Sequence, residues 1–132
     1  CMRYCIMKKT DTFMKDPQKD GKLPVFSGVM GRFPRALKLV ADISEWGAAR
    51  RDLPPGDMSF LDMDPNDLRD ALGRHLLDEA IEGIYNLKDN GFLHAGQQAW
   101  NTLARLEIML EGGVPGRYPV DEVEDDTEEY IV

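Results

Sequence analysis

DPNDLRDALGRHLLDEAIEGIYNL, residues 64–87, has the pattern of one amphipathic helix. It opens with Asp64, whose side chain can accept a hydrogen bond from the free backbone N–H groups of a first turn. Pro65 fits the first helical position, and Asp67 adds a negative charge where the helix dipole favours one. The run Asp89-Asn90-Gly91 contains residues that break helices. We therefore predict a helix from Pro65 to about residue 88.

Two further stretches have helical patterns. HAGQQAWNTLARLEIMLE (94–111) contains no proline and is followed by two glycines, so it predicts a second helix of ordinary length. PRALKLVADISEWGAARR (34–51) predicts another helix, and its buried face would carry Leu37, Val40, Ile43 and either Trp46 or Gly47. The predicted fold class is all-α: a small bundle of three main helices with an irregular N-terminal arm and an acidic C-terminal tail.

The chain length and the distribution of charge suggest how the chain is divided. A chain of 132 residues can form one hydrophobic core. We expect a single α-helical domain over residues 1–113, made of an arm (1–33) and a helical core (34–113). Residues 114–132 contain seven acids and one base, which is too polar a composition to fold alone. This tail would be available to a basic protein partner.

The overall composition excludes some classes of function. A net charge of −8 argues against binding to nucleic acid or to anionic membrane surfaces. No apolar run approaches the length of a transmembrane helix, and no signal-peptide pattern is present. The two cysteines are too few for a disulfide framework. We therefore expect a cytoplasmic protein, in the cytoplasm of the host cell if the chain is viral.

On two of the predicted helices, ionisable and polar residues align along one face. At ~100° per residue, one line of the helix beginning at Pro65 turns from apolar to ionisable, and it contains Leu68, Leu72, His75, Glu79 and Glu82. The helix from 94 to 111 has an apolar stripe of Ala99, Leu103, Leu106 and Leu110. The opposite stripe contains His94, Gln98, Asn101 and Arg105. Both histidines of the chain belong to these polar lines.

The carboxylates Glu79 and Glu82 lie one helical turn apart, with Asp78 beside them. Such a pair can bind Mg²⁺, which takes oxygen ligands, bridges phosphates and lowers the pKa of an attacking water. His94 and Asn101 would then bind the base, sugar or phosphates of a nucleotide. The alternative stays open, because acidic pairs on helices are mostly solvated surface and single histidines more often have structural roles.

Other catalytic motifs are missing from the sequence. It contains no glycine-rich phosphate loop, no C-x-x-C pair and no H-E-x-x-H motif. No serine lies in a nucleophile elbow, and neither cysteine has an evident histidine partner. If the chain is an enzyme, metal-assisted hydrolysis through helix carboxylates is the remaining candidate mechanism.

Three segments in this region resemble a known family. DALGRHLL (70–77), GFLH (91–94) and AWNTLARLE (99–107) resemble, in this order, small phage-type dATP/dGTP diphosphohydrolase-like proteins. ALKLVADISEWGAARR (36–51) resembles the helix of that family that ends in Y-G-A-K-K. The family is similar in style to the MazG-type nucleotide pyrophosphohydrolases, which are all-α oligomers that bind Mg²⁺ through E-x-x-E and E-x-x-D motifs.

The resemblance is incomplete at the metal ligands. Glu79-x-x-Glu82 fits the first motif, whereas Gln98-x-x-Asn101 places amides where the second motif has carboxylates. The family also has an acidic stretch in the turn and a further histidine before A-W-N. This chain instead has EGIYNLKDNG (82–91) and Gln97-Gln98 at these places. Amide oxygens lack the negative charge that strengthens Mg²⁺ binding.

The function implied by the resemblance is hydrolysis of a purine deoxynucleoside triphosphate to its monophosphate and pyrophosphate. The implied catalytic residues are Glu79, Glu82 and His75, and the implied Mg²⁺ ligands are Glu79, Glu82 and Asp78. The implied substrate-binding residues are His94, Gln98, Asn101 and Arg105, in a homo-oligomer. The alternative is a non-catalytic phage accessory protein that binds a nucleotide or a protein through its helical core and acidic tail.

Overall fold

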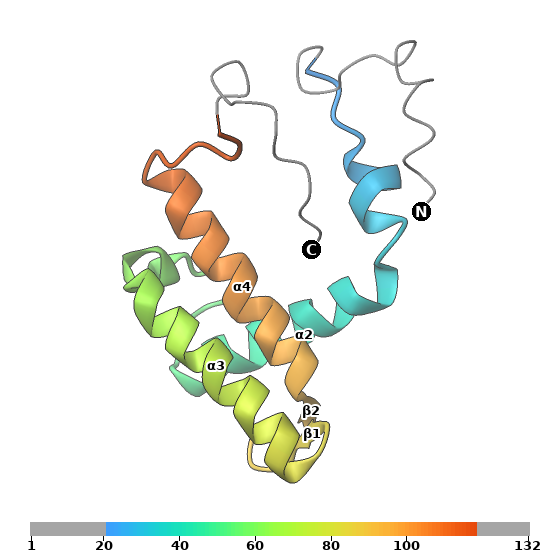
Figure 1. Ribbon diagram of the computed structural model, residues 1–132, viewed down its shortest axis with the longest axis vertical. Coiled ribbons are helices and arrows are strands. Elements are labelled where there is room, and N and C mark those ends of the chain that lie inside the picture. Colours follow the sequence, from blue (N-terminus) through green and yellow to red (C-terminus); the bar gives the residue numbers. More distant parts are fainter. Residues whose placement is uncertain (1–20, 119–132) are drawn as a thin grey trace, which may run out of the picture. The chain divides into compact units, whose positions relative to one another are not determined.

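The computed structural model describes residues 21–118, which are mostly helical, and the all-α fold class is confirmed (Figure 1). The main elements are the helices α2 (Pro34–Arg50), α3 (Pro65–Glu82) and α4 (His94–Glu111) and the strands β1 (Tyr85–Asn86) and β2 (Phe92–Leu93). A π-helical turn (Phe26–Met30) and a 3₁₀ turn (Ser59–Asp62) complete the list. Predictions for residues 1–20 and 119–132 lie outside the described residues. None of the described helices is long and apolar enough to cross a membrane.

The chain divides into two compact units, Cys1–Lys38 and Leu39–Val132, and the division falls inside α2. The described part of the first unit holds the π-helical turn and the beginning of α2, and none of its residues is fully buried. The second unit holds the rest of α2, the helices α3 and α4 and both strands. Every candidate site residue lies in this second unit.

Helix α3 begins as predicted and ends earlier than predicted. The carboxylate of Asp64 accepts a hydrogen bond of 2.9 Å from the backbone N–H of Asn66, and Pro65 is the first helical residue. The predicted end near residue 88 is wrong, because the helix stops at Glu82. Gly83 has φ +106° and ψ −179°, a conformation that essentially only glycine adopts.

The segment after Gly83 forms a small hairpin where the sequence predicted helix. Strands β1 and β2 pair antiparallel, with Tyr85 opposite Leu93 and Asn86 opposite Phe92. The connecting loop contains Asn90 and Gly91, both with positive φ, which is typical of hairpin turns. The backbone N–H of His94 donates to the carbonyl of Ile84 at 2.9 Å. The hairpin thereby fixes the first residue of α4 beside the end of α3.

The main packing contact of the second unit is between α3 and α4, which lie side by side and run in opposite directions (Figure 1). Within residues 21–118, the buried apolar side chains are Ile43, Leu68, Phe92 and Ala104. Helix α2 reaches α4 at Gly96, where an added Cβ would lie 2.7 Å from Cδ1 of Ile43 and 2.9 Å from Cδ2 of Leu39. A side chain at position 96 would therefore require the ends of the Ile43 and Leu39 side chains to shift.

Aromatic pairs attach the shorter elements to the helices. The ring of Trp46 on α2 meets Phe92 of the hairpin edge-on, with the centroids 5.3 Å apart. Phe60 of the 3₁₀ turn meets Trp100 on α4 in the same manner at 5.9 Å. Trp100 therefore has a packing role in the fold.

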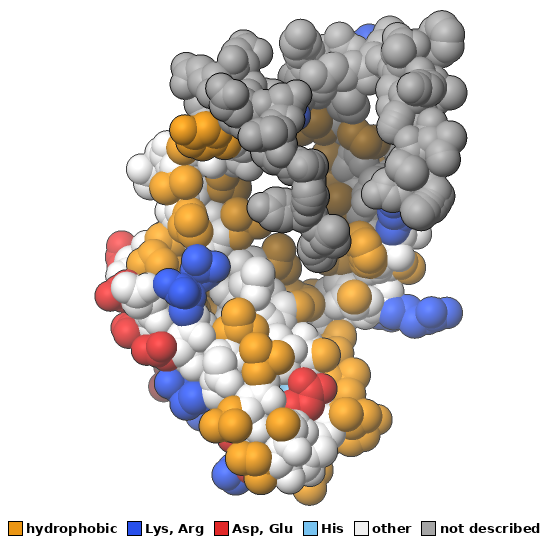
Figure 2. Space-filling view, in the orientation of Figure 1, with side chains coloured by type: hydrophobic (Ala, Val, Ile, Leu, Met, Phe, Trp, Pro, Cys, Tyr) orange, Lys and Arg blue, Asp and Glu red, His pale blue; other side chains and the backbone are white. Residues whose placement is uncertain are grey.

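Helix α4 carries its polar stripe inward and its leucine stripe outward. In the polar stripe, His94 and Asn101 are buried and Gln98 and Arg105 are half-buried. In the apolar stripe, Leu103, Leu106 and Leu110 are 48%, 47% and 43% exposed. Hydrophobic side chains are accordingly visible at the surface over α4 in Figure 2. This arrangement reverses the usual order for a helix of a small soluble domain, whose apolar stripe faces the core.

Candidate functional site

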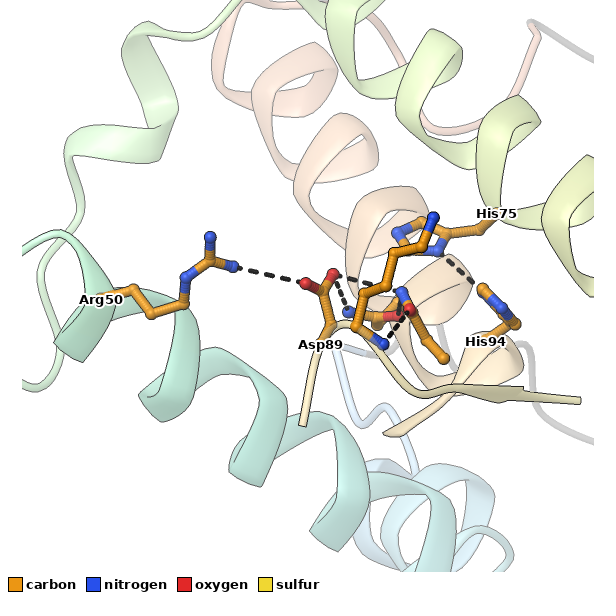
Figure 3. A network of polar contacts seen from close by, with 7 residues as sticks. Arg50, His75, Asp89 and His94 are labelled. Carbon is orange, nitrogen blue, oxygen red and sulfur yellow. Dashed lines mark hydrogen bonds and ion pairs between the residues drawn. The ribbon is translucent and has the colours of Figure 1, made fainter. Parts of the chain in front are cut away.

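The only two histidines of the chain meet between α3 and α4 (Figure 3). Their Nδ1 atoms are 3.1 Å apart, and the ring planes are tilted by 56°. His94 is fully buried, whereas His75 is half-buried. A hydrogen bond between these two atoms requires a proton on one Nδ1 and a free lone pair on the other. The pair therefore shares one proton at this contact.

The environment of His75 keeps its imidazole neutral. Burial is the largest cause that lowers the pKa of His75 below the ordinary value, and the electrostatic interaction with His94 is the second. Asp89 and Asp78 raise the pKa of His75, and Arg74 lowers it. Because the net shift is downward from 6.5, His75 is mostly neutral at pH 7 and can accept a proton.

A second contact between the same helices joins Glu79 and Gln98. The side-chain amide of Gln98 donates a hydrogen bond of 2.8 Å to the Glu79 carboxylate, and both side chains are partly buried. Glu79 follows His75 by one turn of α3, and Gln98 follows His94 by one turn of α4. Four residues singled out in the sequence are thus brought together in two contacts.

The other predicted metal ligands do not gather around Glu79. The carboxylate of Glu82 lies 3.8 Å from Nζ of Lys88 in an ion pair at the surface. Asp78 is half-buried on α3. Within residues 21–118, no three His, Cys, Asp or Glu side chains form a group that could enclose a metal ion. The three acidic residues Asp78, Glu79 and Glu82 therefore do not form a preassembled metal site.

A polar network that the sequence analysis did not single out connects the hairpin to α4. The side-chain amide of Asn86 donates to Oε1 of Gln97 at 3.0 Å and to Oδ2 of Asp89 at 3.2 Å. The amide of Gln97 donates to the same Asp89 oxygen at 3.2 Å. Asn86 and Gln97 are both buried. Each of the three side chains contacts the other two, so the network holds the hairpin loop against the first turn of α4.

Asp89 extends this network to α2. Its other carboxylate oxygen lies 3.8 Å from the guanidinium of Arg50, which also stacks 4.5 Å from the ring centroid of Trp46 (Figure 3). The side chain of Arg50 is 59% exposed, so the ion pair contributes little to stability. Asn90-Gly91 is the one signal in the sequence for this role, because an Asn-Gly turn commonly closes a hairpin and the residues flanking it then face each other.

The polar stripe of α4, which the sequence analysis predicted to bind substrate, contains two buried nitrogen atoms without hydrogen-bond partners in the described part of the chain. They are Nε2 of His94 and Nε of Arg105. They are the only such side-chain atoms in the described part of the chain. Asn101, between them, uses its amide to donate to the backbone carbonyl of Gln97 at 2.9 Å. A buried polar atom without a hydrogen-bond partner costs about 1–3 kcal/mol, so these atoms are positions where a hydrogen-bond partner on a ligand would be stabilising.

We compared the chain with known proteins and found no matching family model, no similar curated protein and no similar solved structure.

Proposed function

We propose that this protein hydrolyses a purine deoxynucleoside triphosphate to its monophosphate and pyrophosphate. The observation that carries the proposal is the pair of unpartnered buried nitrogens, on His94 and Arg105, at the two ends of one polar stripe of α4. His94 and Arg105 are eleven positions apart on the helix, which corresponds to about 16 Å along the axis. This length is comparable with an extended nucleoside triphosphate. The family resemblance supports the identity of the substrate.

The residues at and near the two α3–α4 contacts would have different roles in the reaction. His75 is neutral at pH 7 and would accept the proton of the attacking water, while His94 holds its imidazole in place. Gln98 and Asn101 would contact the nucleotide, and the Arg105 guanidinium would face the phosphates. Glu79 is already oriented by the amide of Gln98. An oriented carboxylate loses less entropy when a ligand binds.

Mg²⁺ would enter together with the triphosphate. In nucleotide sites this ion is typically held by one or two carboxylates plus the substrate phosphates, so a preassembled group of three protein ligands is not required. Glu79 is the carboxylate that fits this role, since it lies at the α3–α4 contact, with Asp78 and Glu82 adding negative charge. The ion would neutralise phosphate charge and lower the pKa of the attacking water.

Pyrophosphate release is the direct test of this function. Purified protein would be incubated with each of the four dNTPs and Mg²⁺, and dATP or dGTP should give the fastest release. Thermal melting provides a second readout, because a ligand that binds the native state must stabilise it. Absence of both pyrophosphate release and nucleotide-dependent stabilisation would contradict the proposal.

The exposed leucine stripe supports a second proposal, association with another protein surface. Leu103, Leu106 and Leu110 follow the three-four spacing of a helix seam, yet they are exposed in the described part of the chain. A second copy of this chain would present the same stripe, so we propose a homo-oligomer in the cytoplasm. If hydrolysis is absent, the same stripe favours an accessory protein, with a basic partner for the acidic tail.

A further inference from the structure

Residues 22–38 carry positive charge and exposed apolar side chains together, and we call them the basic surface. The bases are Lys22, Arg32, Arg35 and Lys38, and the stretch contains no acid. All four bases are exposed, and none forms an ion pair with a carboxylate in the described part of the chain. The basic surface is therefore available to an acidic partner.

The large apolar side chains of the basic surface are exposed as well. Between 45% and 71% of the area of each is accessible within the described residues: Leu23, Val25, Phe26, Val29, Met30 and Phe33. Soluble monomers rarely expose large contiguous apolar patches, and such patches mark sites of contact with another molecule. The partner should therefore present acidic and apolar side chains together.

The rest of the chain has the opposite charge. Residues 1–38 contain nine bases and three acids, whereas residues 39–132 contain seven bases and 21 acids. The acids are densest in residues 119–132, PVDEVEDDTEEYIV, where there are seven acids and no base. The same segment contains two valines and the run Tyr130-Ile131-Val132. It therefore combines the two kinds of side chain that the basic surface requires.

We propose that the basic surface of one copy of this chain binds the segment 119–132 of a second copy. The choice of a second copy rests on the association proposed above through the leucine stripe of α4. The segment begins eight positions after Glu111, the last residue of α4, so this association brings it close to the other copy. Fourteen extended residues span up to about 50 Å, whereas a small domain is about 30 Å across, so the segment is long enough.

An anionic lipid surface would also attract the four bases, but the charge of the whole chain opposes it. A uniformly negative surface repels residues 39–132 within about a Debye length, which is roughly 10 Å at 0.1 M salt. In a symmetric pair of copies, each copy supplies one basic surface and one acidic segment. Both sets of opposite charges then meet at the same time, which favours a second copy over a membrane.

Paramagnetic NMR on the full chain tests the contact. All proteins carry Cys1→Ser and Cys5→Ser, so that a nitroxide attaches only at Thr127→Cys. The chain with the nitroxide, unlabelled with ¹⁵N, is mixed with ¹⁵N-labelled chain without a nitroxide. The amide signals of residues 22–38 should broaden, and they should recover in about 1 M salt, where the Debye length is about 3 Å. Broadening only when both labels are on one chain would overturn the proposal.

Matched charge reversals locate the contact. Arg32→Glu combined with Arg35→Glu brings like charges together, so it should abolish the broadening and weaken binding of the segment about tenfold or more. Arg51→Glu combined with Arg69→Glu changes the net charge equally at exposed positions outside the basic surface, and the broadening should remain. Circular dichroism checks that each variant is folded. Equal broadening in the two double variants would overturn the proposal.

Two further measurements separate this inference from its alternatives. In sedimentation, an oligomer whose signals at residues 22–38 do not broaden would overturn this inference alone, whereas a monomer without broadening would also contradict the association through α4. Vesicles of phosphatidylcholine and phosphatidylserine are the second probe. Vesicle binding that is lost in Arg32→Glu/Arg35→Glu, without broadening by the nitroxide in the parent, would assign the basic surface to a lipid and overturn the proposal.

Discussion

The side-chain amide of Gln98 on α4 donates a hydrogen bond of 2.8 Å to the carboxylate of Glu79 on α3. The carboxylate is thereby held at a helix contact, in contrast to Glu82, whose partner Lys88 is 81% exposed. The two glutamates of one E-x-x-E motif therefore have different environments, and they are expected to respond differently to substitution.

Glu79→Gln should lower pyrophosphate release at least ~100-fold, which corresponds to about 2.7 kcal/mol of transition-state stabilisation. The amide oxygen can still accept the hydrogen bond from Gln98, so the fold should be retained. Initial rates with dATP and dGTP measure the effect. Glu82→Gln is the matched control and should change the rate far less; an equal loss in both variants would show that the two carboxylates act as one unit.

Acid should destabilise the metal-free protein through His75. The folded pKa of His75 lies below its unfolded value of about 6.5, so the unfolded state binds more protons in the window between the two values. Stability is therefore complete above about pH 6.5 and is lost as the pH falls towards the folded pKa. Melting temperatures in EDTA at about pH 7.5 and pH 5.5 should differ less for His75→Gln than for the parent. An identical pH dependence in both proteins would contradict the prediction.

Leu103→Glu combined with Leu106→Glu should convert an oligomer into a folded monomer. Both side chains are about half exposed in the single chain, so the substitution removes little core packing and places charges on the proposed contact surface. Sedimentation at micromolar concentration measures the change, with Thr102→Glu, at an exposed neighbouring position, as the control. A parent protein that is already a monomer would rule out this contact.

Gly96→Ala and Gly73→Ala should have opposite effects on stability. At Gly96 a methyl group would collide with the buried Ile43 and with Leu39, at a cost of about 1–3 kcal/mol. At Gly73, in the interior of α3, nothing lies within 4 Å of the new methyl group. Alanine there should stabilise the helix by about 0.5–1 kcal/mol. Urea unfolding of both variants provides the measurement, and stabilisation by Gly96→Ala would show that α2 does not pack on α4.

The helix positions were predictable from local chemistry. The start of α3 follows from the Asp64 side chain and Pro65, which act within one turn, and α4 follows from an uninterrupted helical pattern between Phe92-Leu93 and Gly112. The end of α3 was predicted too late because the apolar spacing continues through Ile84 and Leu87. Gly83 stops the helix through its backbone conformation, which a pattern of side chains does not reveal.

The candidate site was predictable only in part, because its contacts join residues of different elements. His75, Glu79, His94 and Gln98 were found from their alignment along the helices. Asn86 and Asp89 were assigned to a helix and its breaker, so their meeting with Gln97 depended on a hairpin that was not predicted. The inward direction of the polar stripe of α4 is also a tertiary property, since the leucine stripe has the stronger local preference for burial.

The hairpin between α3 and α4 has a consequence for the order of folding. It brings His75 to His94 and Glu79 to Gln98, and the partners of each pair are 19 positions apart in sequence, so the loop that must close is short. A short loop loses little entropy on closure, and contacts local in sequence form rapidly. The α3–hairpin–α4 unit is therefore expected to assemble first, and α2 should dock later through the surface at Gly96, where Ile43 and Leu39 make their closest approach.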